Sequence, residues 1–132
     1  MFQKKILVPL GPLGKDLKSV HYALSLAARL KAKVYILQQV AHTEDERQFS
    51  SWLDEALSDL INNARQAGLT VSHYLTRREL GKEAVDLAKA EGIDLLVFDA
   101  DEGLNERFLL QVRSLALPQI IQVKEKDWVN YF

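Results

Sequence analysis

Short apolar runs alternate with longer amphipathic segments along the whole chain. Residues 5–10 and 95–98 are almost continuously apolar, and residues 33–40 are mostly apolar with several β-branched side chains. Continuous apolar runs of this length are typical of parallel strands that are covered on both faces. The segments between the runs carry apolar residues at helical spacing. The pattern therefore predicts an α/β fold in which strands and helices alternate.

Five strands and four helices follow from this pattern. Ser50 and Ser51 precede the second helix as its expected N-cap, and Gly68 and Gly92 follow the second and third helices, where glycine favours a C-terminus. Residues 70–77 alternate polar and apolar side chains, as an edge strand does. Right-handed crossovers then give one parallel sheet between two helix layers, a three-layer α/β/α domain. The expected helices cover residues 15–31, 52–64, 81–92 and 108–116, and the expected strands cover 5–10, 33–40, 70–77, 94–98 and 119–124.

An acidic cluster follows the fourth expected strand. The apolar run ends at Phe98 and is followed by Asp99, Asp101, Glu102 and Gly103. Ligands of open α/β sheets bind at the carboxyl ends of the strands, so this cluster marks a candidate ligand site. A calcium loop is a minority interpretation, because the glycine comes one place early and the twelfth position is not acidic. The favoured explanation is that these acids stabilise the start of the next helix.

Composition narrows the possible partners. The chain has 132 residues, 17 basic and 18 acidic side chains, a formal net charge of -1 and no cysteine. This balance gives no basic footprint for nucleic acid or for an anionic membrane, and the lack of cysteine removes disulfides and thiolate sites. No apolar run approaches the roughly 20 residues that span a bilayer. We expect a single domain over residues 1–132 in a cytoplasmic setting.

Other candidate motifs have simpler explanations. Residues 11–15, Gly-Pro-Leu-Gly-Lys, have two residues between the glycines where a phosphate-binding loop has four, so we interpret them as a strand-to-helix turn. The three histidines, at positions 21, 42 and 73, lie in separate elements with no metal-ligand spacing, and we expect no metal site. Arg77 and Arg78 are expected to pair with Glu79, Glu83 or solvent.

Three stretches together resemble the universal stress protein family. They are Lys-Ile-Leu-Val-Pro-Leu at 5–10, the helix and strand start at 22–34, and Glu-Ala-Val-Asp-Leu-Ala-Lys-Ala-Glu-Gly-Ile-Asp-Leu-Leu-Val at 83–97, in the family's order and spacing. The resemblance implies the sheet order 3-2-1-4-5 and a nucleotide cleft between strands one and four. Pro9 and Val40 match family positions on the adenine side of that cleft.

The phosphate side of the cleft departs from the family pattern. Relatives that bind ATP have a glycine signature after strand four, whereas Asp99 and Glu102 stand here at its first two glycine positions, and Gly11 replaces an aspartate after strand one. Glycines let backbone N–H groups approach phosphates, while carboxylates repel them. We therefore expect weak ATP binding or none and no resident cofactor, although carboxylates could hold a divalent ion that bridges to phosphate. The candidate cleft residues are Pro9, Leu10, Gly11, Val40, Asp99, Asp101 and Glu102.

The last expected strand suggests a mode of association. It carries Ile120, Ile121 and Val123 at a sheet edge, and an exposed apolar edge needs to be covered or paired. Relatives often dimerise through their fifth strands, so the resemblance implies a homodimer through these three residues. We expect a non-catalytic interaction or regulatory module with an unknown protein partner. The alternative is a sensor that binds an adenine nucleotide or a metal-bridged ligand in the cleft, and an ATP hydrolase is disfavoured because no positioned base or phosphate loop is evident.

Overall fold

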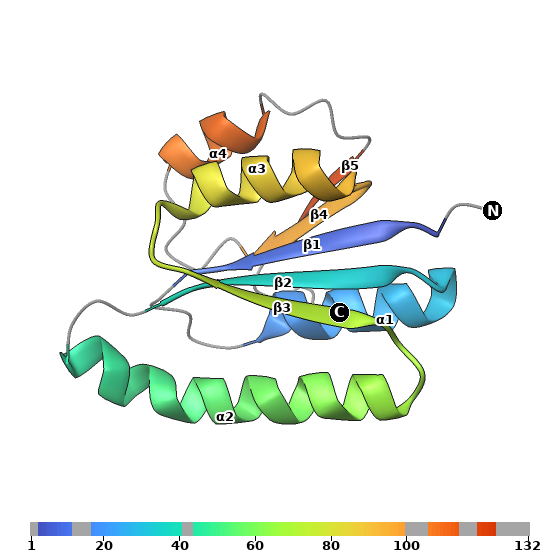
Figure 1. Ribbon diagram of the computed structural model, residues 1–132, viewed down its shortest axis with the longest axis horizontal. Coiled ribbons are helices and arrows are strands. Elements are labelled where there is room, and N and C mark those ends of the chain that lie inside the picture. The colour runs from blue at the N-terminus through green and yellow to red at the C-terminus, as the bar shows by residue number, and fades with distance from the viewer. Residues whose placement is uncertain (1–2, 12–16, 41–43, 100–105, 114–118, 124–132) are drawn as a thin grey trace, which may run out of the picture.

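A computed structural model describes residues 3–11, 17–40, 44–99, 106–113 and 119–123. Strands and helices alternate throughout these ranges, as the sequence pattern predicts (Figure 1). The elements are β1 (Lys5–Leu10), α1 (Lys18–Leu30), β2 (Lys33–Gln39), α2 (Glu44–Gln66), β3 (Val71–Thr76), α3 (Leu80–Glu91), β4 (Leu95–Asp99), α4 (Glu106–Arg113) and β5 (Gln119–Val123). None of the helices in these ranges is long and apolar enough to cross a membrane.

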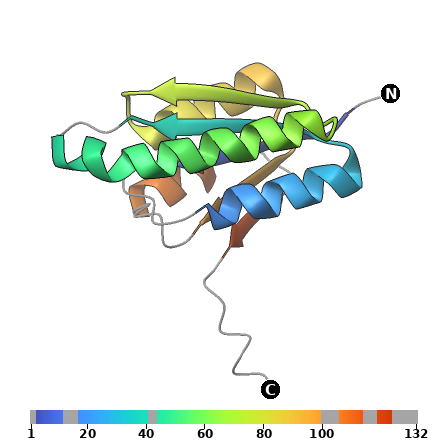
Figure 2. The same cartoon turned by 90° about the horizontal axis from the view of Figure 1, so that it is seen from below.

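All five strands form one parallel sheet in the order β3-β2-β1-β4-β5. Helices α3 and α4 cover one face and helices α1 and α2 cover the other, where they run side by side (Figures 1 and 2). The predicted α/β class, the three layers and the strand order implied by the resemblance are therefore confirmed. Strands β3 and β5 are the two edges of the sheet.

Each inner strand is apolar because it contributes to two cores. Ile6 and Val8 of β1 belong to the core under α1 and α2, whereas Leu7 belongs to the core under α3 and α4. Strand β4 repeats this alternation with Val97 on the first side and Phe98 on the second. Successive strand residues point to opposite faces of the sheet. When helices cover both faces, nearly every side chain of the strand is buried and therefore apolar.

Helix α2 begins earlier than the sequence pattern predicts. It starts at Glu44, so the prediction that Ser50 and Ser51 form its N-cap is wrong, and both residues lie inside the helix. The expected helix began at residue 52, whereas α2 starts with the acidic residues Glu44 and Asp45. Acidic residues are common in the first turn of a helix, because the helix dipole favours negative charge there.

The predictions for the edge strand and the helix ends are confirmed. The middle of β3 is exposed, whereas Val71 and Thr76 at its ends are buried. Gly68 and Gly92 follow α2 and α3 with φ of 96° and 67°, the left-handed conformation that glycine adopts at little cost.

Ser19 is a polar residue inside the core. It lies in the first turn of α1, has no exposed surface, and its Oγ atom makes no hydrogen bond. A buried hydroxyl without a partner loses its hydration and gains nothing in return. We expect Ser19→Ala to raise the free energy of unfolding by about 1 kcal/mol, measured by urea denaturation. Ser25→Ala, on the exposed face of the same helix, is the control for helix propensity, and an equal gain in both variants would contradict the explanation.

His73 is exposed on β3, but its ring is partly desolvated, and we expect it to make the stability of the fold dependent on pH. Burial lowers the pKa of His73 below its ordinary value of 6.5; nearby Asp54 raises it and Arg65 lowers it further. The Nε2 atom of His73 lies 2.8 Å from Gln38 Oε1, and Gln38 Nε2 donates to Asp54 Oδ1 at 2.6 Å. The unfolded chain therefore takes up the proton more readily than the folded one.

The pH dependence that follows has a definite sign. The stabilisation from neutral His73 is complete above pH 6.5 and is lost as the pH falls through the lowered folded-state pKa. Urea denaturation at a series of pH values should show the free energy of unfolding rising with pH in that window. His73→Gln should flatten the rise, and an unchanged slope in this variant would assign it to other groups.

Candidate functional site

The candidate cleft lies at the edge of the sheet where the parallel strands end. Pro9, Leu10 and Gly11 come at the end of β1, Val40 directly follows β2, and Asp99 is the last residue of β4. The structure therefore brings these five predicted residues to one edge, and Pro9, Leu10, Gly11 and Asp99 are buried there. Asp101 and Glu102, the other two predicted residues, lie outside the described part of the chain.

At this edge the pairing between β1 and β4 ends early. Strand β1 pairs with β2 over six residue positions, but with β4 only at Ile6–Leu95 and Leu7–Leu96. On its other side, β4 pairs with β5 along its whole length. The strand order reverses direction between β1 and β4, and a crevice at such a switch point is the usual ligand site of open α/β sheets.

The hydrogen bonds of β1 alternate between its two neighbours. The backbone carbonyl of Lys4 accepts from Lys33 N of β2, and the carbonyl of Lys5 accepts from Asp94 N just before β4. In a parallel ladder the backbone N–H and C=O groups of successive residues point to opposite neighbouring strands. The odd-numbered residues of β1 therefore direct these groups toward β4.

Pro9 is consequently the residue whose missing N–H group faces β4. Its place in the ladder comes two residues after Leu7, at the point where pairing with β4 ends. A proline is expected only at the edges of sheets, and here it lies in the central strand, where it removes the next hydrogen bond that β1 could donate to β4. The family resemblance implied Pro9 as a cleft residue but not this role, although a proline inside an inner strand is itself the signal.

Several hydrogen bonds join the end of β2 to the end of β3 and the residues that follow it. Val40 N donates to the Thr76 carbonyl at 2.8 Å, and Gln39 Nε2 donates to the Arg78 carbonyl at 3.1 Å. Thr76 Oγ1 accepts from Arg78 N at 3.0 Å, and the Arg78 guanidinium lies 3.5 Å from the Glu83 carboxylate. The expected pairing of Arg78 with Glu83 is confirmed. Sequence reasoning did not assign the contacts of Thr76 and Gln39, since ordinary polar residues at strand ends carry no distinctive signal.

Asp99 is a buried acidic residue at the end of β4. Only 2% of its surface is exposed. Leu95 and Val97 belong to the core on the α1 side of the sheet, so strand alternation directs Asp99 to that side as well. Asp99 is the only ionisable residue among the described members of the cleft.

The histidines do not form a site in the described part of the chain. His21 lies on the exposed surface of α1, His73 lies on β3, and His42 is outside the described residues. Within those residues, no group of three His, Asp or Glu side chains is arranged to hold a metal ion. The Gly-Pro-Leu-Gly-Lys turn lies outside the description beyond Gly11.

We compared the chain with known protein families and with curated sequences. The sequence profile described as "Universal stress protein family" matches residues 3–111. A search among curated protein sequences found no match.

Several solved structures have the same fold. A universal stress protein from Archaeoglobus fulgidus in complex with dAMP is 20% identical, with a TM-score of 0.65 over 94% of this chain and 100% of that one. A universal stress protein in complex with cAMP is 17% identical, with a TM-score of 0.66 over 96% and 100% of the two chains. An Arabidopsis thaliana family member with AMP bound is 14% identical, with a TM-score of 0.60 over 94% and 93%. Because its profile match covers most of the sequence and its fold agrees with these structures, the chain belongs to the universal stress protein family.

Proposed function

We propose that this chain acts without catalysis, as a homodimeric interaction and regulatory module. The observation that carries the proposal is the apolar edge formed by β5. Ile120 is 41% exposed on one face of this strand, and Ile121 and Val123 on the other face are only partly buried against the core. An unpaired, apolar edge strand favours pairing with another strand.

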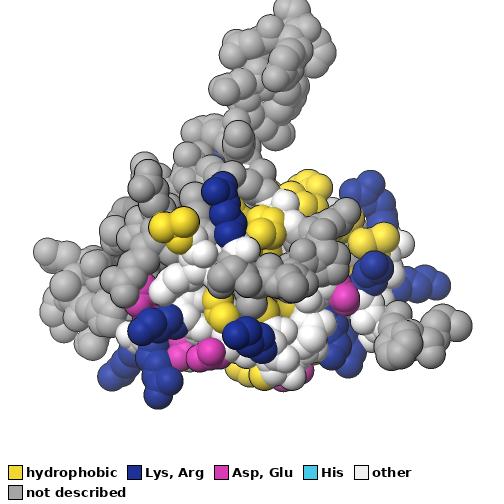
Figure 3. All heavy atoms as spheres, turned by 90° about the horizontal axis from the view of Figure 1, so that it is seen from above, with side chains coloured by type: hydrophobic (Ala, Val, Ile, Leu, Met, Phe, Trp, Pro, Cys, Tyr) yellow, Lys and Arg dark blue, Asp and Glu magenta, His cyan; other side chains and the backbone are white. Residues whose placement is uncertain are grey.

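Helix α1 extends this apolar edge on one face of the sheet. Ala28 and Lys31 lie on the flank of α1 that faces the end of α2. Helical periodicity puts Tyr22 and Leu26 on the opposite flank, beside β5. Leu26 packs against the core and Tyr22 is 40% exposed. By contrast, the described hydrophobic side chains on the α3 and α4 face are scattered among basic ones (Figure 3).

A two-fold pairing of β5 strands would use this surface in both copies. The same patch of both copies then forms the interface. Each exposed side chain is buried in both copies, and the backbone groups of the two edge strands form hydrogen bonds with each other. Sedimentation equilibrium at tens of micromolar protein tests this arrangement. A dimer is the expected result, and a monomer at that concentration would contradict it.

We further propose that the cleft does not hold the phosphates of ATP. The buried Asp99 supports this, because it ends β4 beside the switch point of the sheet and takes the place of a glycine of the family signature. It is also the only ionisable group among the described cleft residues. These residues therefore do not supply both a nucleophile and a general base, as a hydrolase needs. Isothermal titration with ATP and magnesium should show no binding in the low micromolar range, and binding in that range would contradict the proposal.

A ligand sensor is the second candidate function. The early end of the pairing between β1 and β4 supports it, as do the related structures solved with dAMP, cAMP and AMP. In this alternative the Pro9 and Val40 side of the cleft holds an adenine nucleotide or a metal-bridged ligand. Native mass spectrometry of the purified protein distinguishes the two, because a sensor should retain a small molecule and the interaction module should not.

A further inference from the structure

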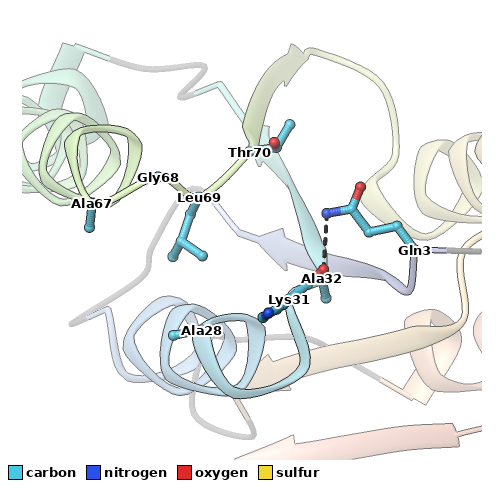
Figure 4. Close-up of a pocket in the computed structure, with 8 residues that line it drawn as sticks. All are labelled: Gln3, Ala28, Lys31, Ala32, Ala67, Gly68, Leu69 and Thr70. Carbon is cyan, nitrogen blue, oxygen red and sulfur yellow. Dashed lines mark hydrogen bonds between the residues drawn. The ribbon is translucent and has the colours of Figure 1, made fainter.

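A second cavity lies at the end of the sheet opposite the cleft. Its volume is about 390 Å³, and it is bounded by the ends of α1 and α2 and by the segments that precede β1 and β3 (Figure 4). Ala32, which is buried, and Leu69, which packs against the core, supply apolar surface. Gln3, Lys31 and Thr70 supply polar groups to the same cavity. This volume is within the range of pockets that bind small molecules.

Lys31 is held in the cavity wall in a costly backbone conformation. It ends α1 with φ of 55° and ψ of 45°, and among the described residues it is the only one other than glycine with a positive φ. Glycine takes this role at the end of α3, where Gly92 has φ of 67° and ψ of 50°, and Gly68 shortly after α2 also has a positive φ. A side chain in the left-handed region costs stability, and such strain is often found where a side chain serves a function. Here it places a lysine where glycine would be more stable.

The surroundings of Lys31 favour an anion. The segments that contribute the cavity contain no acidic residue between positions 17 and 43 or between 60 and 78. The carbonyl ends of α1 and α2 bring partial negative charge, which Arg29 and Arg65 in the last turns offset. Within the described structure, no carboxylate forms an ion pair with the Lys31 ammonium. The backbone carbonyl of Lys31 accepts a hydrogen bond from Gln3 Nε2 at 2.9 Å.

These features point to the chemical class of the ligand. A phosphate group is usually bound by several backbone N–H groups or by more than one cation, and this cavity offers a single ammonium group. A carboxylate needs fewer partners, and the apolar surface beside Lys31 suits a hydrocarbon body. We propose that the cavity binds a small amphipathic carboxylate, with the carboxylate on Lys31 Nζ and the apolar part against Ala32 and Leu69.

Benzoate, hexanoate and inorganic phosphate are suitable probes of the full chain. In an amide NMR titration, benzoate and hexanoate should give saturable shifts at Lys31, Ala32 and Gly68–Thr70, and phosphate should give none there. Saturable shifts only around Gly11 and Val40 would assign the carboxylates to the cleft and overturn the proposal. Shifts that grow linearly with concentration would also overturn it, since they indicate non-specific binding.

Substitution of Lys31 separates binding from folding. Lys31→Gly relieves the left-handed strain, so this variant should unfold at higher urea concentration while its affinity for benzoate falls at least tenfold. Lys89→Gln, which removes a charge in the last turn of α3 away from the cavity lining, should bind benzoate within twofold of the wild type. A Lys31→Gly variant that is less stable, or that binds benzoate as well as the wild type, would overturn the proposal.

Discussion

Ile120→Lys is expected to convert the proposed dimer into a monomer, with self-association weakened by about 100-fold or more. Ile120 is 41% exposed on the edge strand β5. In a two-fold interface one substitution changes two positions, so two apolar contacts are lost and two ammonium groups are brought together. Loss of the burial of two isoleucines alone costs about 3 kcal/mol. Sedimentation velocity over a concentration series measures the change.

The opposite edge of the same sheet offers a matched control. Leu75 on β3 is 64% exposed and is also an aliphatic residue of an edge strand. Leu75→Lys introduces the same charge at a similar site, and it should leave the dimer intact. If Leu75→Lys dissociates the dimer and Ile120→Lys does not, the proposed interface is on the wrong edge of the sheet.

Much of the fold could be predicted because each element carries a local signal. The apolar runs of β1 and β4 require cover on both faces, the alternation along β3 indicates an edge, and Gly68 and Gly92 mark helix ends. The start of α2 was missed because acidic residues suit both a loop and the first turn of a helix. The left-handed Lys31 was missed because lysine gives no sequence signal for that conformation.

The edge of the sheet at which the candidate cleft residues lie could be predicted, but the hydrogen bonding of β1 at that edge could not. Pro9, Gly11 and Asp99 lie at the edge that the strand order implies, because all parallel strands end there. Whether Pro9 removes a hydrogen bond to β4 depends on which side of β1 the Pro9 nitrogen faces. That side follows from the hydrogen-bond phase of the strand, which the paired carbonyls of Lys4 and Lys5 reveal and the sequence does not.

Electrostatics at this cleft should reverse the usual preference for phosphorylated ligands. Asp99 is buried, and Asp101 and Glu102 follow it in the sequence. A phosphate group about 4 Å from one carboxylate meets repulsion of roughly 1 kcal/mol in water and more in a cleft. Each added phosphate is therefore expected to weaken binding, so that adenosine binds more tightly than AMP and AMP more tightly than ATP. Calorimetric titrations without divalent metal ions measure this order, and added salt should narrow the differences.

Neutralising the two carboxylates after β4 is expected to raise ATP affinity about tenfold, because about 1.4 kcal/mol of repulsion is removed. The variant Asp101→Asn with Glu102→Gln leaves the buried Asp99 in place, so the end of β4 is not disturbed. Asp86→Asn, on the exposed surface of α3, removes a negative charge elsewhere and should leave ATP affinity unchanged. Two results would show that the carboxylates after β4 do not exclude phosphate from this cleft. One is that the wild-type protein binds ATP more tightly than adenosine without metal. The other is that Asp86→Asn raises ATP affinity as much as the double variant does.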